Sequence, residues 1–176
     1  MCKIDEEKQS DELLLLGEFI RHFNIHYSLL LRRYAKFKTI DKFDSSNIDL
    51  VTYLDIIVVQ LRAMCIENPK NKRNYTVQSL LKQLGEPQLA QRIDDMLNEE
   101  FFGNDVIPAF PIRKALKLLA DEFICHYDNF DGKKSDGWYY AGTIEKHLCD
   151  CYSKANLDYI METIIDCVGE GLTIKM

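Results

Sequence analysis

Apolar residues recur every three or four positions along most of the chain, which is the spacing of amphipathic helices. The longest run starts at Asp11 and keeps this spacing to Phe37, so it predicts one long first helix. A second run follows Ser45, Ser46 and Asn47, which are all suited to a helix N-cap, and has Asp49 in the favoured acidic first turn. The buried face predicted for this second helix consists of Ile48, Val51, Leu54, Ile57, Val58, Leu61 and Met64.

Turn-forming residues separate the next two predicted helices. Pro69 breaks the pattern inside a loop over 68–74, because proline cannot continue a helix. Thr76 is then placed to cap a short helix, Val77 to Leu84, which Gly85 closes in a left-handed conformation. A fourth helix is predicted from Pro87 to about Phe101, since proline suits the first turn of a helix.

The C-terminal half repeats this alternation of loops and helices. After a second loop, Pro111 opens a helix that is predicted to run to about Tyr127. A polar connection over 128–137 follows, and two closing helices, or one kinked helix, are predicted from Trp138 to about Val168. Asn156 is a plausible cap between them. The stripe predicted to be buried on the helix after Pro111 consists of Ile112, Leu116, Leu119, Phe123 and Tyr127.

The fold class follows from this pattern together with length and composition. A chain of 176 residues with only 8 Gly and 4 Pro is long enough for one core and poor in turn residues. We therefore predict an all-α, single-domain bundle of five to seven helices over residues 11–171, preceded by a flexible N-terminus over 1–10.

The net charge and the cysteines indicate which partners and which compartment to expect. The net charge of -6 disfavours a large nonspecific nucleic-acid surface, since binding along a phosphate backbone needs clustered Lys and Arg. No stretch approaches the roughly 18 to 20 apolar residues that a membrane-spanning helix needs. The 6 Cys lie within helical patterns rather than in a short-loop disulfide framework. A cytoplasmic protein without a membrane partner is the expectation.

Carboxylates and an imidazole converge at the end of the helix after Pro111. Glu122 and His126 are four residues apart and share a face, with Asp121 about a third of a turn further round and Asp128 just beyond. A histidine beside a carboxylate can exchange a proton near neutral pH. The alternative is that His126 completes a helix, where a cation favours the negative end of the dipole.

The segment from Ala120 to Asp128, with the sequence Ala-Asp-Glu-Phe-Ile-Cys-His-Tyr-Asp, resembles the end of a characteristic helix in the HEPN superfamily. Members of this superfamily, the higher eukaryotes and prokaryotes nucleotide-binding domains, are all-α bundles. One of their helices ends in Arg, then Asn or Asp, then three to five residues, then His. The order of long helices, short-helix insert and closing helix is also similar, especially to the abortive-infection-like bacterial branch.

The resemblance implies a role in bacterial defence or in a toxin–antitoxin system. It implies RNA or nucleotide binding, a cognate partner protein and a homodimer with the site between two subunits. Asp121 and His126 would be the catalytic residues, with His126 as general acid or base. Ala120 stands where the family has its catalytic Arg, so we expect weak or no metal-independent ribonuclease activity.

An arginine from another helix or a second subunit is the only way to replace the missing guanidinium. Arg113 is thirteen residues before His126 on the same helix, roughly 20 Å away at ~1.5 Å per residue. Arg62, Arg32 and Arg33 are the candidates on other helices. The alternative function is a non-enzymatic helical interaction module without a nucleic-acid role, in which the polar cluster is structural.

Each of the other candidate sites also has a purely structural interpretation. His147 and Cys151 are four apart and can face one Zn(II), but structural zinc needs four ligands and buried cysteines usually act as small hydrophobes. A basic loop with Lys70, Lys72 and Arg73 can contact phosphate, yet such loops are usually just solvated. The aromatic run 138–140 is either a docking patch or core packing.

Two reaction classes lack the motifs they need. A metal-dependent hydrolase of the bundle type requires carboxylates facing one another across helices. The candidates are Glu18, Asp55, Glu122, Glu145 and Glu162, but no Glu-x-x-His pair accompanies them. The sequence also lacks a glycine-rich phosphate loop, a nucleophile elbow and a His-Glu-x-x-His helix, so neither a cofactor nor a metal is expected.

Overall fold

The computed structural model describes residues 3–40, 47–67, 75–101, 109–124 and 135–173. Within these ranges, residues 3–13, 15–16, 122–123 and 135–140 are described by their backbone alone. Helices account for nearly all of the described chain, so the predicted all-α, single-domain bundle is confirmed. The domain boundaries at 11 and 171 and the flexibility of residues 1–10 stay predictions.

The described elements are seven α-helices, two π-helical turns and one pair of very short strands. The helices are α1 (Lys3–Lys38), α2 (Ile48–Leu61), α3 (Val77–Gln83), α4 (Pro87–Asn98), α5 (Ile112–Leu118), α6 (Ser135–Cys149) and α7 (Leu157–Thr173). The π-helical turns are η1 (Arg62–Ile66) and η2 (Leu119–Ile124), and the antiparallel strands are β1 (Glu100–Phe101) and β2 (Phe110–Pro111).

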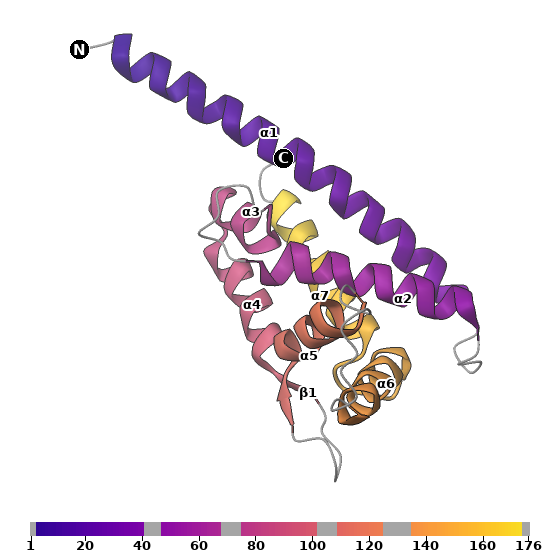
Figure 1. Ribbon diagram of the computed structural model, residues 1–176. Helices are drawn as coiled ribbons and strands as arrows, with labels where there is room; N and C mark the ends of the chain where they lie inside the picture. The colour runs from indigo at the N-terminus through magenta and orange to yellow at the C-terminus, as the bar shows by residue number, and fades with distance from the viewer. Residues whose placement is uncertain (1–2, 41–46, 68–74, 102–108, 125–134, 174–176) are drawn as a thin grey trace.

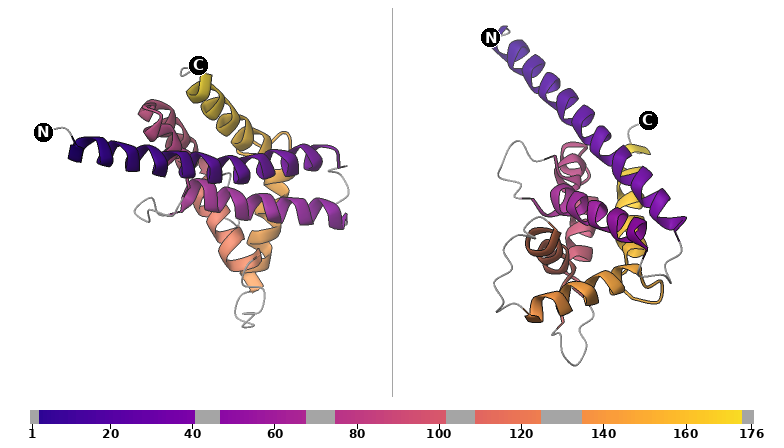
Figure 2. Two further views of the ribbon diagram at one scale, coloured as in Figure 1. Left: turned by 90° about the horizontal axis from the view of Figure 1, so that it is seen from above. Right: turned by 45° about the vertical axis from the view of Figure 1, so that its right-hand side comes forward.

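The two longest N-terminal elements form one layer, and the other helices pack beneath it. Figures 1 and 2 show α1 and α2 side by side with opposite directions. Helix α7 crosses behind α2 in Figure 1. Helices α4, α5 and α6 lie on the side of α2 that faces away from α1. The N-terminal half of α1 extends past the rest of the bundle (Figure 1). The helix begins at Lys3 rather than near Asp11, so the acidic start of the chain is helical.

Local capping signals in the sequence correspond to observed caps. The Asn47 side chain accepts from the backbone N–H of Asp49 at 3.0 Å and thereby starts α2. Thr76 and Asn156 cap α3 and α7 in the same way, with N–H to side-chain oxygen distances of 3.2 and 2.8 Å. Gly85 has a φ of 80°, the left-handed conformation predicted at the end of the third helix.

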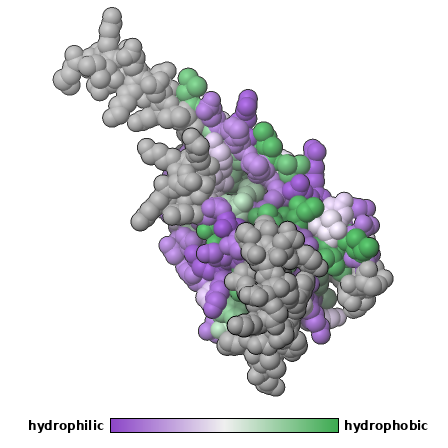
Figure 3. Space-filling view, in the orientation of Figure 1, coloured by the Kyte–Doolittle hydropathy of each residue, from purple (hydrophilic) through white to green (hydrophobic). Residues whose placement is uncertain are grey.

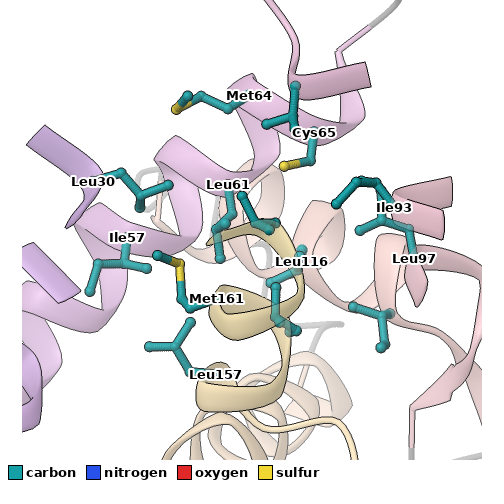
Figure 4. Packing of buried hydrophobic residues seen from close by; sticks show 14 of the residues in the cluster. Leu30, Ile57, Leu61, Met64, Cys65, Ile93, Leu97, Leu116, Leu157 and Met161 are labelled. Atoms are coloured by element: carbon teal, nitrogen blue, oxygen red, sulfur yellow. The ribbon is translucent and has the colours of Figure 1, made fainter. Parts of the chain in front are cut away.

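The core lies where α2, α5 and α7 meet. Figure 4 shows Leu61, Leu116 and Met161 directed toward one another from these three helices. The predicted core positions Ile112, Leu116 and Leu119 are fully buried. Phe123 and Tyr127 of the same predicted stripe have side chains outside the described set.

Two residues of the predicted α2 face are exposed instead of buried. Ile48 is 79% exposed and Val51 is also exposed, whereas Leu50, which the periodicity left out, is buried. Leu50 precedes Leu54 by four residues and shares its face, while Ile48 lies about 200° around the helix from Leu50 at ~100° per residue. The first turn of α2 therefore presents apolar side chains to solvent.

Candidate functional site

Two helices of the core change into wider π-helical turns before they end. α2 becomes η1 at Arg62, and α5 becomes η2 at Leu119. In a π turn the backbone N–H bonds to the carbonyl five residues back, and such turns are rare and frequent at functional sites. The two turns are neighbours, because α2 packs against η2 and α5 packs against η1. Their junction is the candidate site.

An ion pair joins the two turns. Arg62 donates through Nε to Oδ1 of Asp121 at 2.8 Å and through Nη2 to Oδ2 at 3.3 Å. The carboxylate of Glu67, which directly follows η1, contacts Nη1 of the same guanidinium. The exposed fractions of the Arg62, Asp121 and Glu67 side chains are 28%, 30% and 33%. The cluster is therefore reachable from solvent but partly desolvated.

The geometry fixes the guanidinium firmly. Two parallel bonds from one face of an arginine to both oxygens of a carboxylate define the orientation as well as the distance. Every guanidinium nitrogen of Arg62 contacts a carboxylate oxygen, with Glu67 on the third. One positive charge therefore faces two negative ones. An arginine held in this way is well positioned, and much of its charge is balanced.

Position 120 is part of the core. The Ala120 side chain is 1% exposed, so a long charged side chain has no room there without displacing neighbours. Arg62 of η1, the turn that continues α2, instead brings a guanidinium to Asp121, the residue next to Ala120. From the sequence, Arg62, Arg32 and Arg33 were equal candidates to replace the missing arginine. The packing of α2 on η2 brings Arg62 to the site, whereas the other two arginines lie on α1.

Asp121 is the one predicted catalytic residue that the structure places. His126 and Asp128 lie outside the described residues, and so does the side chain of Glu122. The carboxylate of Asp121 accepts from Arg62 through both of its oxygens. Sequence reasoning gave Asp121 the role of orienting His126 or capping the helix; within the described residues its partner is Arg62.

A buried glutamine of α3 holds the other end of η1. Gln78 of α3 donates from Nε2 to the backbone carbonyl of Cys65 at 2.8 Å and to Asp94 Oδ1 of α4 at 3.2 Å. The same Asp94 oxygen accepts from Arg113 of α5 at 3.3 Å. The last carbonyls of a helix lack partners within it, so Gln78 supplies a donor that the backbone itself cannot provide. Burial raises the pKa of the Cys65 thiol to about 12, which keeps it protonated.

A second polar position lies on the same face of α2. Asp55 precedes Arg62 by seven residues, nearly two full turns, and faces Glu145 of α6 closely enough for their charges to interact. Burial raises the pKa of the Asp55 carboxyl, and Oδ1 of Asp55 is buried without a hydrogen-bond partner among the described residues. Burial also raises the pKa of Glu145, and the charge of Asp55 adds to the effect.

The remaining sequence candidates are not brought together. His147 packs on the Phe101 ring at 4.8 Å between ring centroids, and burial lowers its pKa. α6 ends at Cys149, so Cys151 lies in the following turn and shares no helix face with His147. Among the described residues, no three or more His, Cys, Asp and Glu side chains gather as metal ligands do. The basic loop and the side chains of 138–140 lie outside the described set.

The described part of the chain holds no helix with the length and apolar character needed to cross a membrane. The strongest site in it is the junction of η1 and η2, which combines a rare backbone geometry with an arginine fixed by two carboxylates. Comparisons of the chain with models of protein families, with curated proteins and with solved structures found no match.

Proposed function

We propose that this protein is a HEPN-like helical bundle of bacterial defence or toxin–antitoxin type that binds RNA or nucleotide phosphate, with weak or no ribonuclease activity. The observation that carries the proposal is the bidentate pair between Arg62 and Asp121. It supplies a guanidinium beside the segment that resembles the HEPN motif, where Ala120 replaces the family's arginine.

Arg62 suits a phosphate for two reasons. The guanidinium is planar, always charged and rich in N–H donors. Nη2 contacts Asp121 and Nη1 contacts Glu67, and each of these nitrogens has a second N–H that can donate to a phosphate. Asp121 also holds the group in one orientation, so little conformational entropy is lost when a ligand binds. In this proposal Asp121 positions Arg62, and His126 exchanges a proton with the ribose or the leaving group.

The same geometry accounts for the weak catalysis that we propose. A phosphoryl transition state gains negative charge, and a cation stabilises it in proportion to the field that the cation provides. Asp121 and Glu67 reduce that field around Arg62. Binding of a phosphate tolerates this reduction better than rate acceleration does, because the larger charge develops only in the transition state.

A second candidate function is a helical interaction module in which the polar junction is structural. The contact of all three guanidinium nitrogens of Arg62 with carboxylates favours this alternative, since two carboxylates balance the positive charge and the pair can serve to join η1 to η2. The two functions differ in one measurable respect, which is whether releasing Arg62 from a carboxylate creates affinity for phosphate.

The binding experiment uses fluorescence anisotropy with a short, labelled single-stranded RNA. We expect wild-type protein to bind and Arg62→Gln to weaken binding by about tenfold, equal to ~1.4 kcal/mol. Asp121→Asn should bind more tightly than wild type, because it removes a negative charge from beside Arg62 while keeping a side chain of the same shape. Lys117→Gln, at an exposed position of α5, is the matched control for loss of a positive charge.

Affinity that falls steeply with salt supports phosphate contact. An absence of binding in wild type and in Asp121→Asn contradicts the RNA proposal and favours the interaction module. Catalysis is tested separately, by incubating total RNA with wild-type protein and with His126→Ala purified identically. Cleavage that is equal in both preparations comes from a contaminant, and cleavage lost in His126→Ala supports the enzyme.

A further inference from the structure

Helix α2 is apolar on both of its sides, although only one side packs into the bundle. Its buried side consists of Leu50, Leu54, Ile57, Val58 and Leu61. The helix has only two charged residues, Asp49 and Asp55. A helix at the surface of a domain normally has polar residues on the side away from the core, whereas one that is apolar all round is normally buried all round. The outer side of α2 therefore has the composition of a buried surface.

The outer stripe of α2 continues into η1 at helical spacing. It consists of Ile48, Thr52, Ile56, Val59 and Ala63, which follow one another at steps of four, four, three and four. Ile48 is 79% exposed and Ile56 is 38% exposed. Thr52 and Ala63 are exposed as well, and Val59 is half-buried. Among the described residues, this uncharged stripe is open to solvent over four turns.

Helix α1 extends this apolar surface. Gln60 of α2 donates from Nε2 to the carbonyl of His26 in α1 at 3.2 Å. Because the two helices run in opposite directions, Ile56, one turn before Gln60, lies beside Leu29, about one turn after His26. Leu29 is 38% exposed, and together with Ile25 it lines part of an open depression of about 440 Å³ on α1. Figure 3 shows apolar residues over both helices, with polar ones between them.

The α1 edge of this surface is basic, and its cations are not balanced by carboxylates. Arg21 and Arg32 line the depression, and Arg33 and Lys36 follow along α1. In the part of the chain that the structure describes, none of these four side chains forms an ion pair, whereas the nearby Lys38 lies 3.9 Å from Asp158. A partner that covers the surface therefore gains by placing its own carboxylates along α1.

We propose that this α1–α2 surface, formed by the outer stripe of α2 with Ile25 and Leu29 of α1, receives an acidic amphipathic helix of another protein. The apolar residues of that helix cover the outer stripe, and its acidic residues lie along α1. Two antiparallel helices offer a third helix a row of side chains from each, which is how helices add to a bundle. The outer stripe is ~22 Å long at ~1.5 Å per residue, enough for about four turns of a partner.

RNA fits this surface less well than a helix does. Phosphates would gain from the arginines of α1, but they would leave Ile48 and Ile56 without an apolar cover. The inference goes beyond the proposed RNA function and does not rest on it, because it uses neither Arg62 nor Asp121.

Fluorescence anisotropy with two synthetic peptides tests the proposal. Each labelled peptide has about 20 residues, enough for a helix along the outer stripe, and has leucines at helical spacing. One peptide has glutamates along one side, and the other has lysines at the same positions. We expect wild-type protein to bind the glutamate peptide and to bind the lysine peptide about tenfold more weakly, because the basic edge of α1 repels it.

Two changes to the protein separate the apolar contribution from the charged one. Ile56→Glu should weaken binding of the glutamate peptide about tenfold, since it places a like charge within the apolar contact. Leu172→Glu, at a 43% exposed position of α7, is the matched control and should bind as wild type does. Arg32→Gln combined with Lys36→Gln should weaken binding severalfold at low salt, and the difference should fade as salt rises.

Wild-type protein that does not bind the glutamate peptide at its highest soluble concentration overturns the proposal. So does equal affinity for the two peptides, or wild-type affinity in Ile56→Glu. Circular dichroism of each variant shows whether the helices remain folded.

Two other occupants of the surface would also overturn the proposal. If Ile56→Glu abolishes binding of the labelled RNA, then RNA covers this surface. If sedimentation velocity shows a wild-type dimer that Ile56→Glu dissociates, then a second copy covers it. We expect instead that Ile56→Glu keeps wild-type RNA binding and that Arg62→Gln keeps wild-type peptide binding, so failure of one proposal is distinguishable from failure of the other.

Discussion

Two polar positions on one face of α2 differ in how their charges are balanced. At Arg62 a guanidinium joins two carboxylates across η1 and η2, and each group is about one third exposed. At Asp55, seven residues earlier, a carboxylate faces the carboxylate of Glu145, and burial raises the pKa of both. Both positions lie on one face of α2 and its continuation η1, and of the two only the position in η1 has a cation between its carboxylates.

The contrast shows where the bundle gains stability from its polar groups and where it loses stability. Removing one member of a compensated, partly buried cluster leaves the others without partners and is costly. Removing one member of a like-charged pair relieves repulsion. The same type of substitution on one helix face is therefore expected to have opposite signs at the two positions.

The largest expected effect is at the compensated position. Arg62→Met should lower the free energy of unfolding by about 2 kcal/mol, because Asp121 and Glu67 are left close together without their cation. Urea unfolding at pH 7 measures it. Arg92→Met is the matched control, since Arg92 also contacts two carboxylates, Asp166 and Glu170, but is 48% exposed and should cost at most about 0.5 kcal/mol. If Arg62→Met and Arg92→Met lowered the free energy of unfolding equally, the partial burial of the Arg62 cluster would not contribute to stability.

A smaller loss is expected at the end of η1 that Gln78 holds. Gln78→Met keeps the length of the side chain but leaves the buried Cys65 carbonyl without its donor, which should cost about 1.5 kcal/mol in urea unfolding. Gln91→Met on the exposed side of α4 loses only a bond to Asp95 within its own helix, worth about 0.3 kcal/mol. If Gln78→Met is as stable as wild type, the Cys65 carbonyl does not need the Gln78 amide.

The smallest effect should have the opposite sign. Asp55→Asn is expected to stabilise the fold at pH 7 by about 0.5 kcal/mol, since it removes a charge that burial disfavours. A carboxyl whose pKa is raised in the folded state loses its stability contribution as pH rises through that value, so the gain from Asp55→Asn should fade as pH is lowered toward the ordinary carboxyl pKa. Thermal unfolding across this pH range measures it, with exposed Glu100→Gln as control. A gain that is independent of pH would have a different cause.

Local signals predicted most of the fold, because they act over a few residues. Asn47, Thr76, Gly85 and Asn156 end or start helices through bonds to their immediate neighbours, which the sequence displays directly. Periodicity was less reliable at the start of α2, where Ile48 continues the pattern but is exposed among the described residues. The spacing of apolar residues predicts which residues share a helix face, but it does not predict which of them contact another helix.

The candidate site was predicted only in part, because it depends on contacts between distant segments. Asp121 was named from its place beside His126, while its actual partner is Arg62, which is 59 residues away in the chain. Arg62 was one of three arginines with equal standing in the sequence. The π turns have no residue signature of their own, so the widening of α2 and α5 at Arg62 and Leu119 could not be predicted from the sequence.

The order of charged residues along α1 has a consequence for the stability of this helix. Acidic residues outnumber basic ones before position 19, and Lys36 and Lys38 lie in the last turn. An α-helix carries partial positive charge at its N-terminus and partial negative charge at its C-terminus, so this order favours the helix at both ends. The same residues in reverse order would keep the composition of α1 but lose that benefit.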